Sequence, residues 1–274
     1  MKNTTVIYLS LILFHMAILS CEKEHEPKPD VISTPDVTSL GIAPVAKYTI
    51  FDDTYNMRYS KDNRMIQLSG ENMSLSHNPI EFMLNGHKCI TNFVLNKSGC
   101  ATYFEVVHSD GSLYCKYHMK YDSDNYMTEI VKETPWNNSS MKWVISRGEN
   151  GRIENINEYE NGELWRKATY TYGKSNIMVN HDGIFVICPV NDINRSFSLY
   201  LTGLMGRPSG VLPQKYTAIE YLKNGPSHIS GEYTYTINGN HVYAVSEYAY
   251  FDDLDNTYIM FTSTYVYKGL YLYD

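Results

Sequence analysis

Hydrophobic and polar residues alternate with a period of two along most of the chain after Lys47. In residues 232–237, Tyr233, Tyr235 and Ile237 fall on one face and polar side chains fall on the other, which is typical of a strand with one buried face. Residues 259–267 repeat this alternation. Few residues separate successive segments, whereas parallel strands need longer crossover connections. The pattern therefore predicts antiparallel strands.

Turn-forming dipeptides divide these strands. Asn or Asp followed by Gly supplies the positive φ angles of tight hairpin turns, and such pairs occur at Asn85-Gly86, Asp110-Gly111, Asn150-Gly151, Asn161-Gly162, Asp182-Gly183, Asn224-Gly225 and Asn238-Gly239. Weaker polar turns are expected at residues 61–63, 122–125 and 252–256. We therefore predict a single all-β domain over residues 46–274, an antiparallel meander of repeated hairpins. A flat sheet would leave one face wet and both edges open, so we expect a curled or two-layered sheet, with a closed barrel as the alternative.

Two segments interrupt this rhythm. Residues 198–213 begin apolar and become rich in Gly and Pro, so we expect a helical turn followed by an irregular loop. Residues 216–223 fit either a short helix or a strand, and their neighbours favour a strand.

The first 20 residues have the pattern of a secretory leader. Lys2 provides a positive charge, and the largely apolar run at residues 6–19 is too short to span a bilayer comfortably. The small residue Ser20 directly precedes Cys21, which resembles the bacterial lipobox. The resemblance implies cleavage before Cys21 and lipidation of its thiol and new amino group. No later apolar run approaches membrane-spanning length, so we expect the lipid alone to attach the chain to a membrane.

Residues 21–45 are polar and rich in proline, without an apolar period. We therefore expect a flexible tether. Its first acidic residues, Glu22, Glu24 and Glu26, resemble the export signal that sends lipoproteins of the Bacteroides type to the outer cell face. This resemblance implies an outer-membrane lipoprotein that faces the cell exterior, and the periplasmic face is the alternative.

Composition excludes some functions. The chain is 43% hydrophobic and 19% charged, which is typical of a folded protein rather than a disordered one. Its net charge of −7 argues against a nucleic-acid partner, which would favour a basic surface. The 25 Tyr against 9 Phe favour strands with one hydrated face, because Tyr packs its ring and keeps its hydroxyl wet.

Four further cysteines leave the disulfide state open. Export permits disulfides, but buried free thiols are an equal alternative for Cys89, Cys100, Cys115 and Cys188. Neither the spacing of His87 and Cys89 nor the acidic turn at residues 251–256 matches a known metal-binding pattern. No phosphate-binding Gly-rich loop precedes a helix. We expect neither a metal ion nor a cofactor.

Three segments together carry a family resemblance. Residues 121–130 look like the Tyr-Asp (RHS-like) hairpin repeat, and residues 147–156 are a degenerate copy. Residues 203–209 form a Gly-Leu-x-Gly-x-x-Ser loop that is followed by hairpins around Tyr233 and Tyr235. Together they resemble a family of Bacteroides-type surface lipoproteins of unknown function. The resemblance implies a fold and a location, and it names no catalytic residue.

The aromatic residues give the first functional hypothesis. Trp136, Trp143 and Trp165 lie in or beside the repeat region, and exposed Trp on a rigid sheet can stack on sugars or anchor a protein partner. Trp136 lies in a polar loop and is expected to project; Trp143 and Trp165 can equally be core residues. We therefore predict a non-enzymatic module that binds a glycan or an envelope protein.

Two alternatives remain open. No catalytic residue is assigned, yet a glycan hydrolase could pair two carboxylates among Glu105, Glu129, Glu158, Glu163, Glu220 and Glu247. A structural role in an envelope complex would need an exposed apolar patch at residues 199–212.

Overall fold

The computed structural model describes residues 36–40, 44–50, 53–69, 74–75, 80–84, 87–108, 110–173, 203–207, 209, 211–238, 241–251 and 254–267. All of them belong to a compact unit that spans Ser33–Asp274. The predicted leader, Cys21, Cys188 and the turns at Asn85-Gly86 and Asp182-Gly183 lie outside the described residues. Among the described residues no helix has the length and apolar character needed to cross a membrane.

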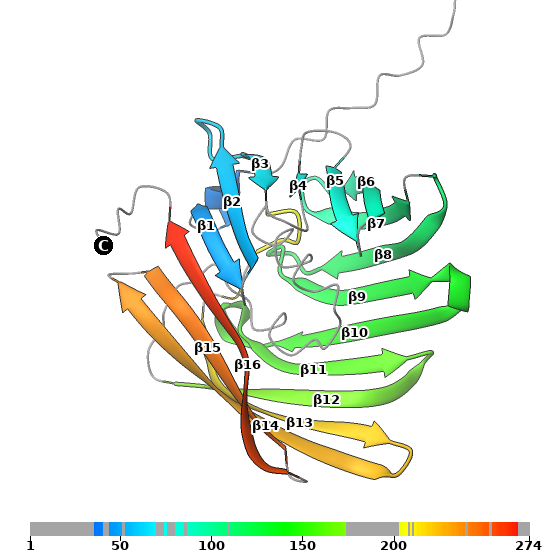
Figure 1. The fold of residues 1–274 in the computed structure, drawn as a ribbon, viewed down its shortest axis with the longest axis vertical. Helices are drawn as coiled ribbons and strands as arrows, with labels where there is room; N and C mark the ends of the chain where they lie inside the picture. The colour runs from blue at the N-terminus through cyan, green and yellow to red at the C-terminus, as the bar shows by residue number, and fades with distance from the viewer. Residues whose placement is uncertain are drawn as a thin grey trace, which may run out of the picture. The chain divides into compact units, whose positions relative to one another are not determined.

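In the described part of the chain, sixteen strands form one antiparallel sheet (Figure 1). The strands are β1 (Val45–Ile50), β2 (Asp53–Tyr59), β3 (Met65–Ser69), β4 (Ser74–Leu75), β5 (Ile80–Leu84), β6 (His87–Leu95), β7 (Ala101–His108), β8 (Leu113–Tyr121), β9 (Met127–Thr134), β10 (Ser139–Arg147), β11 (Ile153–Glu160), β12 (Glu163–Tyr172), β13 (Pro213–Leu222), β14 (Gly225–Asn238), β15 (His241–Phe251) and β16 (Leu254–Tyr267). Among the described residues, short 3-10 helices accompany them at η1 (Val37–Leu40), η2 (Pro135–Asn137) and η3 (Glu149–Gly151). The predicted all-β antiparallel fold is confirmed.

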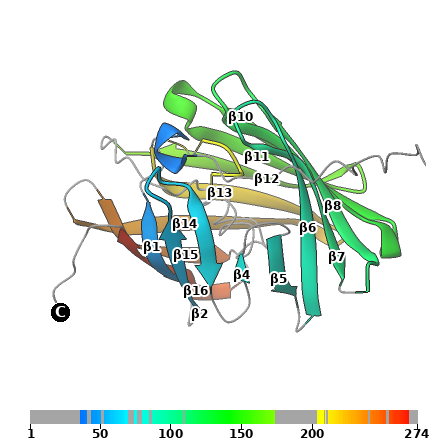
Figure 2. The same ribbon diagram turned by 90° about the horizontal axis from the view of Figure 1, so that it is seen from above.

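The strand order is that of a meander with one rearrangement at its start. Strands β5 to β16 follow each other in sequence order, and β1 then pairs with β16, so that β2, β3 and β4 continue the sheet beyond it (Figures 1 and 2). The two edge strands are therefore β4 and β5, which are consecutive in sequence. Within the described ranges no hydrogen-bond ladder joins these two strands, so the alternative of complete closure is not realised there.

The turn chemistry explains where strands end. Asn161 and Gly162 have φ angles of 49° and 88°, which is the positive pair that a tight two-residue hairpin requires. At the turn between β8 and β9, the Asp122 carboxylate accepts hydrogen bonds from the backbone N–H groups of Asp124 and Tyr126, each at 2.9 Å. The ambiguous segment at residues 216–223 is a strand, because β13 runs to Leu222 before its hairpin.

Burial alternates along each strand and defines two faces. On β12, Arg166, Ala168 and Tyr170 are buried, whereas Lys167 and Thr169 are exposed. We call the buried side the inner face and the opposite side the outer face. The outer face carries paired charges: Lys116 with Glu133, Lys120 and Lys142 with Glu129, and Lys215 with Glu232.

Successive turns of a meander lie at alternate ends of the sheet, and the two ends differ. At one end, which we call the packed end, the turns of β8–β9 and β10–β11 contact residues 203–207. The Arg207 N–H donates to the Asn125 carbonyl at 2.8 Å, and the Tyr126 ring lies between the guanidinium groups of Arg147 and Arg207, at 5.3 and 5.2 Å. Gly151, with φ of 69°, leaves room for this ring, since a Cβ there would approach it to 2.2 Å.

Three segments that carry the family resemblance therefore meet at the packed end. The predicted irregular loop does occur around residues 203–212, and its described apolar residues are buried: Leu204, Met205, Val211 and Leu212. A structural role would need an exposed apolar patch in residues 199–212, and these four described side chains do not provide one.

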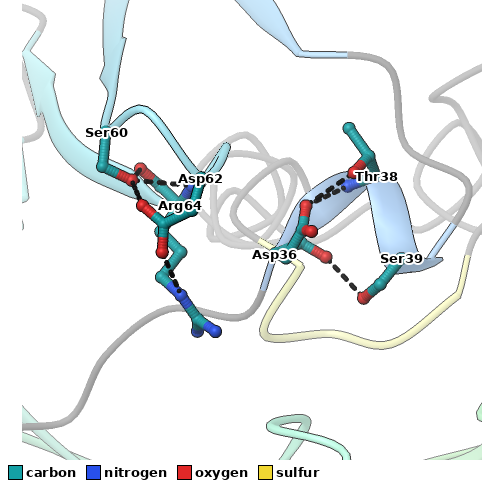
Figure 3. Close-up of polar contacts among 6 residues, drawn as sticks. All are labelled: Asp36, Thr38, Ser39, Ser60, Asp62 and Arg64. Carbon is teal, nitrogen blue, oxygen red and sulfur yellow. Dashed lines mark hydrogen bonds and ion pairs between the residues drawn. The ribbon is translucent and has the colours of Figure 1, made fainter.

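The chain joins the folded unit at the same packed end. Val37 and Leu40 of η1 pack against Cys100, next to the turn between β6 and β7. The Asp36 carboxylate accepts hydrogen bonds from Thr38, while Asp62 binds Arg64 and Ser60 in the turn between β2 and β3 (Figure 3). Residues 36–40, which the sequence assigned to the tether, are thus packed, and the folded part begins before residue 46.

Candidate functional site

A straight row of polar side chains crosses the inner face. Trp143 of β10 pairs with Glu158 of β11, Glu158 with Arg166 of β12, and Arg166 with Glu220 of β13. Directly opposed residues share a face of the sheet, so these four side chains lie next to one another. We call them the charged row. The strand period places them on the buried side, because Ile156, Ala168 and Ala218 lie two positions away on the same strands.

Two carboxylates share one guanidinium in this row. Arg166 Nη1 lies 3.6 Å from Glu158 Oε1, and Arg166 Nε lies 3.6 Å from Glu220 Oε1. Both distances exceed those of a good hydrogen bond. The Glu158 side chain is 1% exposed and its Oε2 atom has no hydrogen-bond partner, whereas the Glu220 side chain is 19% exposed. Burial raises the pKa of Glu158 to about 7, although the nearby Arg166 and Trp143 oppose the shift.

A second buried carboxylate lies farther from the row. Glu247 of β15 is fully buried opposite Tyr233 of β14, and neither of its oxygens has a partner within hydrogen-bond limits. Burial raises its pKa to about 8, while the Tyr216 hydroxyl and Arg166 act in the opposite direction. Tyr216 reaches this group because Gly231 has no side chain: a Cβ on Gly231 would lie 2.0 Å from the Tyr216 ring.

An apolar layer separates the charged row from the tyrosines. Ile156, Ala168, Ala218 and Ile229 face each other across β11 to β14 and are all buried. The two alanines leave space for longer neighbours such as Arg166 on the same strand. The inner face is therefore layered by residue type rather than uniformly apolar.

The end of the sheet opposite the packed end carries exposed apolar side chains. Trp136 on η2 is 68% exposed, Leu164 at the start of β12 is 38%, and Tyr221 and Leu222 at the end of β13 are 46% and 50% exposed. They belong to the hairpins β9–β10, β11–β12 and β13–β14, whose turns lie at the same end (Figure 1). We call these four residues the hairpin rim.

Backbone contacts tie the first two hairpins of the rim together. The Ser140 N–H donates to Asn161 Oδ1 at 2.8 Å, and the Asn161 N–H donates to the Ser140 carbonyl at 2.9 Å. β12 and β13 then pair from Arg166 and Glu220 to Tyr172 and Pro213, so their pairing ends directly before the rim residues. The rim is therefore mounted on neighbouring strands and not on independent loops.

The structure separates the three tryptophans predicted as ligand contacts. Trp136 projects from its loop, as expected, whereas Trp143 is only 3% exposed and belongs to the charged row. Trp165 is half-buried at the β12 bulge, next to the inner-facing Arg166. Sequence reasoning missed Leu164, Tyr221 and Leu222. Their adjacency to Asn161-Gly162 and Asn224-Gly225 was the available signal, because those two turns fall at one end of a meander.

Of the six candidate carboxylates, the structure brings Glu158 and Glu220 together. Glu129 is on the outer face, held by two lysines at 2.8 Å each, and Glu105 is bound by the Tyr103 hydroxyl. Glu163 is exposed beside the β11–β12 turn. Arg166 stands between Glu158 and Glu220, so the arrangement is an ion-paired row rather than two carboxyl groups that face an open space.

The cysteines and acidic groups add little chemistry to the described part of the chain. Cys100 is a free thiol, and burial raises its pKa to about 11; Cys115 is also buried. The side chain of Cys89 and all of Cys188 lie outside the described residues. No three His, Cys, Asp or Glu side chains in the described ranges are grouped so that they could hold a metal ion.

Comparisons with known proteins show a shared fold. No protein-family model matches the chain, and no curated protein matches it. Among solved structures, a porin-like protein from Bacteroides uniformis superimposes with a TM-score of 0.59 at 15% identity, covering 83% of this chain and 99% of that one. A porin-like protein from Bacteroides vulgatus gives 0.55 at 13% identity, covering 83% of this chain and 100% of that one. The chain therefore shares its fold with Bacteroides porin-like proteins.

Proposed function

We propose that the chain is an exported lipoprotein, attached through Cys21 to the outer membrane and displayed on the cell exterior. The leader, the lipobox-like junction and the acidic residues after Cys21 support this location, as does a fold shared with proteins of Bacteroides. A Cys21→Ala protein should lose its lipid and appear in the soluble fraction, and protease added to intact cells should digest the wild type. Membrane retention of Cys21→Ala would contradict the lipid anchor. Protection of the wild type from protease would contradict display on the cell exterior.

The similarity in fold to porin-like proteins does not favour a pore over a binding role for this chain. The outer face of this sheet carries Lys–Glu pairs on β8, β9 and β10. A sheet that faces lipid instead presents an apolar band at its outer surface. These paired charges support a sheet surrounded by water.

The molecular role that we propose is binding of another envelope protein through the hairpin rim. The observation that carries it is the 68% exposure of Trp136 at the end of the sheet that also carries the exposed Leu164, Tyr221 and Leu222. Trp and Tyr are the residues that most often dominate protein interfaces, and the two leucines offer aliphatic surface that suits a protein better than a sugar. η1 packs at the packed end, and the rim lies at the opposite end of the sheet.

A site-specific photo-crosslinker tests this role in intact cells. A benzoyl-phenylalanine placed at position 136 should form an adduct with one envelope protein, whereas the same group at Thr217, which is exposed on the outer face, should not. The other rim residues should contribute to the same contact, so Tyr221→Ser combined with Leu222→Ser should reduce the adduct that forms at position 136. Equal adducts at both positions, or none, would contradict a rim interface. Trp136-dependent signal on a glycan array would replace the protein partner with a glycan.

A further inference from the structure

The charges at the rim end of the inner face are unbalanced. Glu158 and Glu220 share the single guanidinium of Arg166. Glu158 Oε2 is buried without a hydrogen-bond donor, and leaving a buried acceptor unpaired is destabilising. Lys132 of β9 is another buried cation of the inner face. Its ammonium group lies 5.7 Å from the centre of the Tyr117 ring on β8. A second cation beside Glu220 would pair each carboxylate with its own positive group.

The row can be approached from the hairpin rim. Leu222 follows Glu220 by two positions on β13, so it lies on the inner side of the rim, directly outside the charged row. The bulge beside Glu158 places Leu164 opposite Tyr159, so Leu164 lies on the outer side. Leu222 is 50% exposed, and the Glu220 side chain is 19% exposed. Glu160 and Glu163 are exposed at the neighbouring β11–β12 turn. The rim is therefore apolar and acidic at once.

We propose that the rim recognises a basic side chain, a lysine or arginine of the partner protein, which packs along Leu222 and pairs with Glu220. This inference rests on the protein-binding role proposed above and specifies the partner's chemistry. The aliphatic stem of a lysine or arginine packs on leucine while its charged head reaches an acidic group. Glu160 and Glu163 attract the basic segment and suppress acidic competitors.

Selection from random peptides displayed on phage tests the proposal with the full mature chain as bait. Selected peptides should carry Lys or Arg beside apolar residues. Their binding should weaken about tenfold on Glu220→Gln, the range expected when one partner of a charge pair is lost. Because Glu220→Gln also alters an ion pair of the fold, Glu160→Gln with Glu163→Gln serves as a second, fully exposed variant. Glu232→Gln, on the outer face, is the matched control and should leave binding unchanged.

The outcomes separate this inference from the proposed function. Two results would overturn the basic-side-chain inference and leave the rim interface in place. In the first, the selected peptides need Trp136 but carry no basic residue. In the second, they bind Glu220→Gln and Glu160→Gln/Glu163→Gln as well as they bind the wild type. Equal weakening by Glu232→Gln shows attraction to net charge only and also overturns it. Peptides that bind Trp136→Ser undiminished contradict the rim interface itself.

Discussion

The two faces of the same strands hold their charges in opposite ways. On the outer face, hydrogen bonds from the Lys120 and Lys142 ammonium groups lower the pKa of Glu129. On the inner face, burial raises the pKa of Glu158 to about 7 and that of Glu247 to about 8. The residue type is the same, so the difference comes from access to water and the number of nearby donors. The outer charges contribute to solubility and to strand register. The inner charges carry a desolvation cost, which other interactions within the protein must offset.

Removal of the shared guanidinium should give the largest effect. Arg166→Met leaves Glu158 and Glu220 without a cation, and breaking a buried pair costs about 3–5 kcal/mol. Urea unfolding at neutral pH measures the loss. The matched control is Lys167→Met, which changes the next residue of β12 on the exposed side and should cost less than about 0.5 kcal/mol. Similar losses in the two variants would show that the inner and outer charges are equivalent.

The pH dependence of stability should reveal the inner carboxylates. The folded pKa of Glu247 lies above its ordinary value of 4.5, so the folded protein keeps a proton that the unfolded chain has released. The free energy of unfolding should therefore fall, by about 2–4 kcal/mol, as the pH rises from about 4.5 to about 8. Urea unfolding across this range measures the slope, and Glu247→Gln should flatten it. A slope unchanged in Glu247→Gln would contradict the assignment.

The outer carboxylates should act with the opposite sign. Because the pKa of Glu129 is lowered, its contribution to stability is present above pH 4.5 and is lost as the pH falls below that value. The pH profile of the wild type therefore contains a limb below about pH 4.5 from the outer face and a limb between about pH 4.5 and 8 from the inner face. Replacing the carboxylates of one face should change only the limb of the pH profile that belongs to that face.

The next largest loss of stability should come from disturbing the close packing of the inner face. Gly231→Ala places a Cβ against the Tyr216 ring, and overpacking of this kind costs about 1–3 kcal/mol. Thermal unfolding measures the change, with Ser230→Ala, an adjacent residue exposed on the outer face, as the control. If the two variants unfold at the same temperature, the Tyr216 ring has space to move and the inner face is looser than described.

The sequence contained much of the fold and less of the site. Alternation and turn dipeptides such as Asn161-Gly162 are local signals, so strands and hairpins followed from them. The pairing of β1 with β16 is a long-range event with no local signal. The charged row depends on register across four strands, and bulges such as the one beside Glu158 shift register in ways that a sequence does not show. Trp136 was predicted to project because its loop context is local, whereas Leu164 and Leu222 look like ordinary strand residues.

The smallest expected effect belongs to the outer ion pairs. Lys120→Ala removes one of the two lysines on Glu129, but Lys142 still binds this carboxylate at 2.8 Å, and exposed pairs contribute about 0–1 kcal/mol. We therefore expect a loss below about 0.5 kcal/mol in urea, and a smaller one in high salt because added ions screen exposed charges. The loss from Arg166→Met should persist in the same salt, since buried pairs are screened much less. If salt reduces both losses equally, the charged row is reached by solvent and its carboxylates titrate as surface groups do.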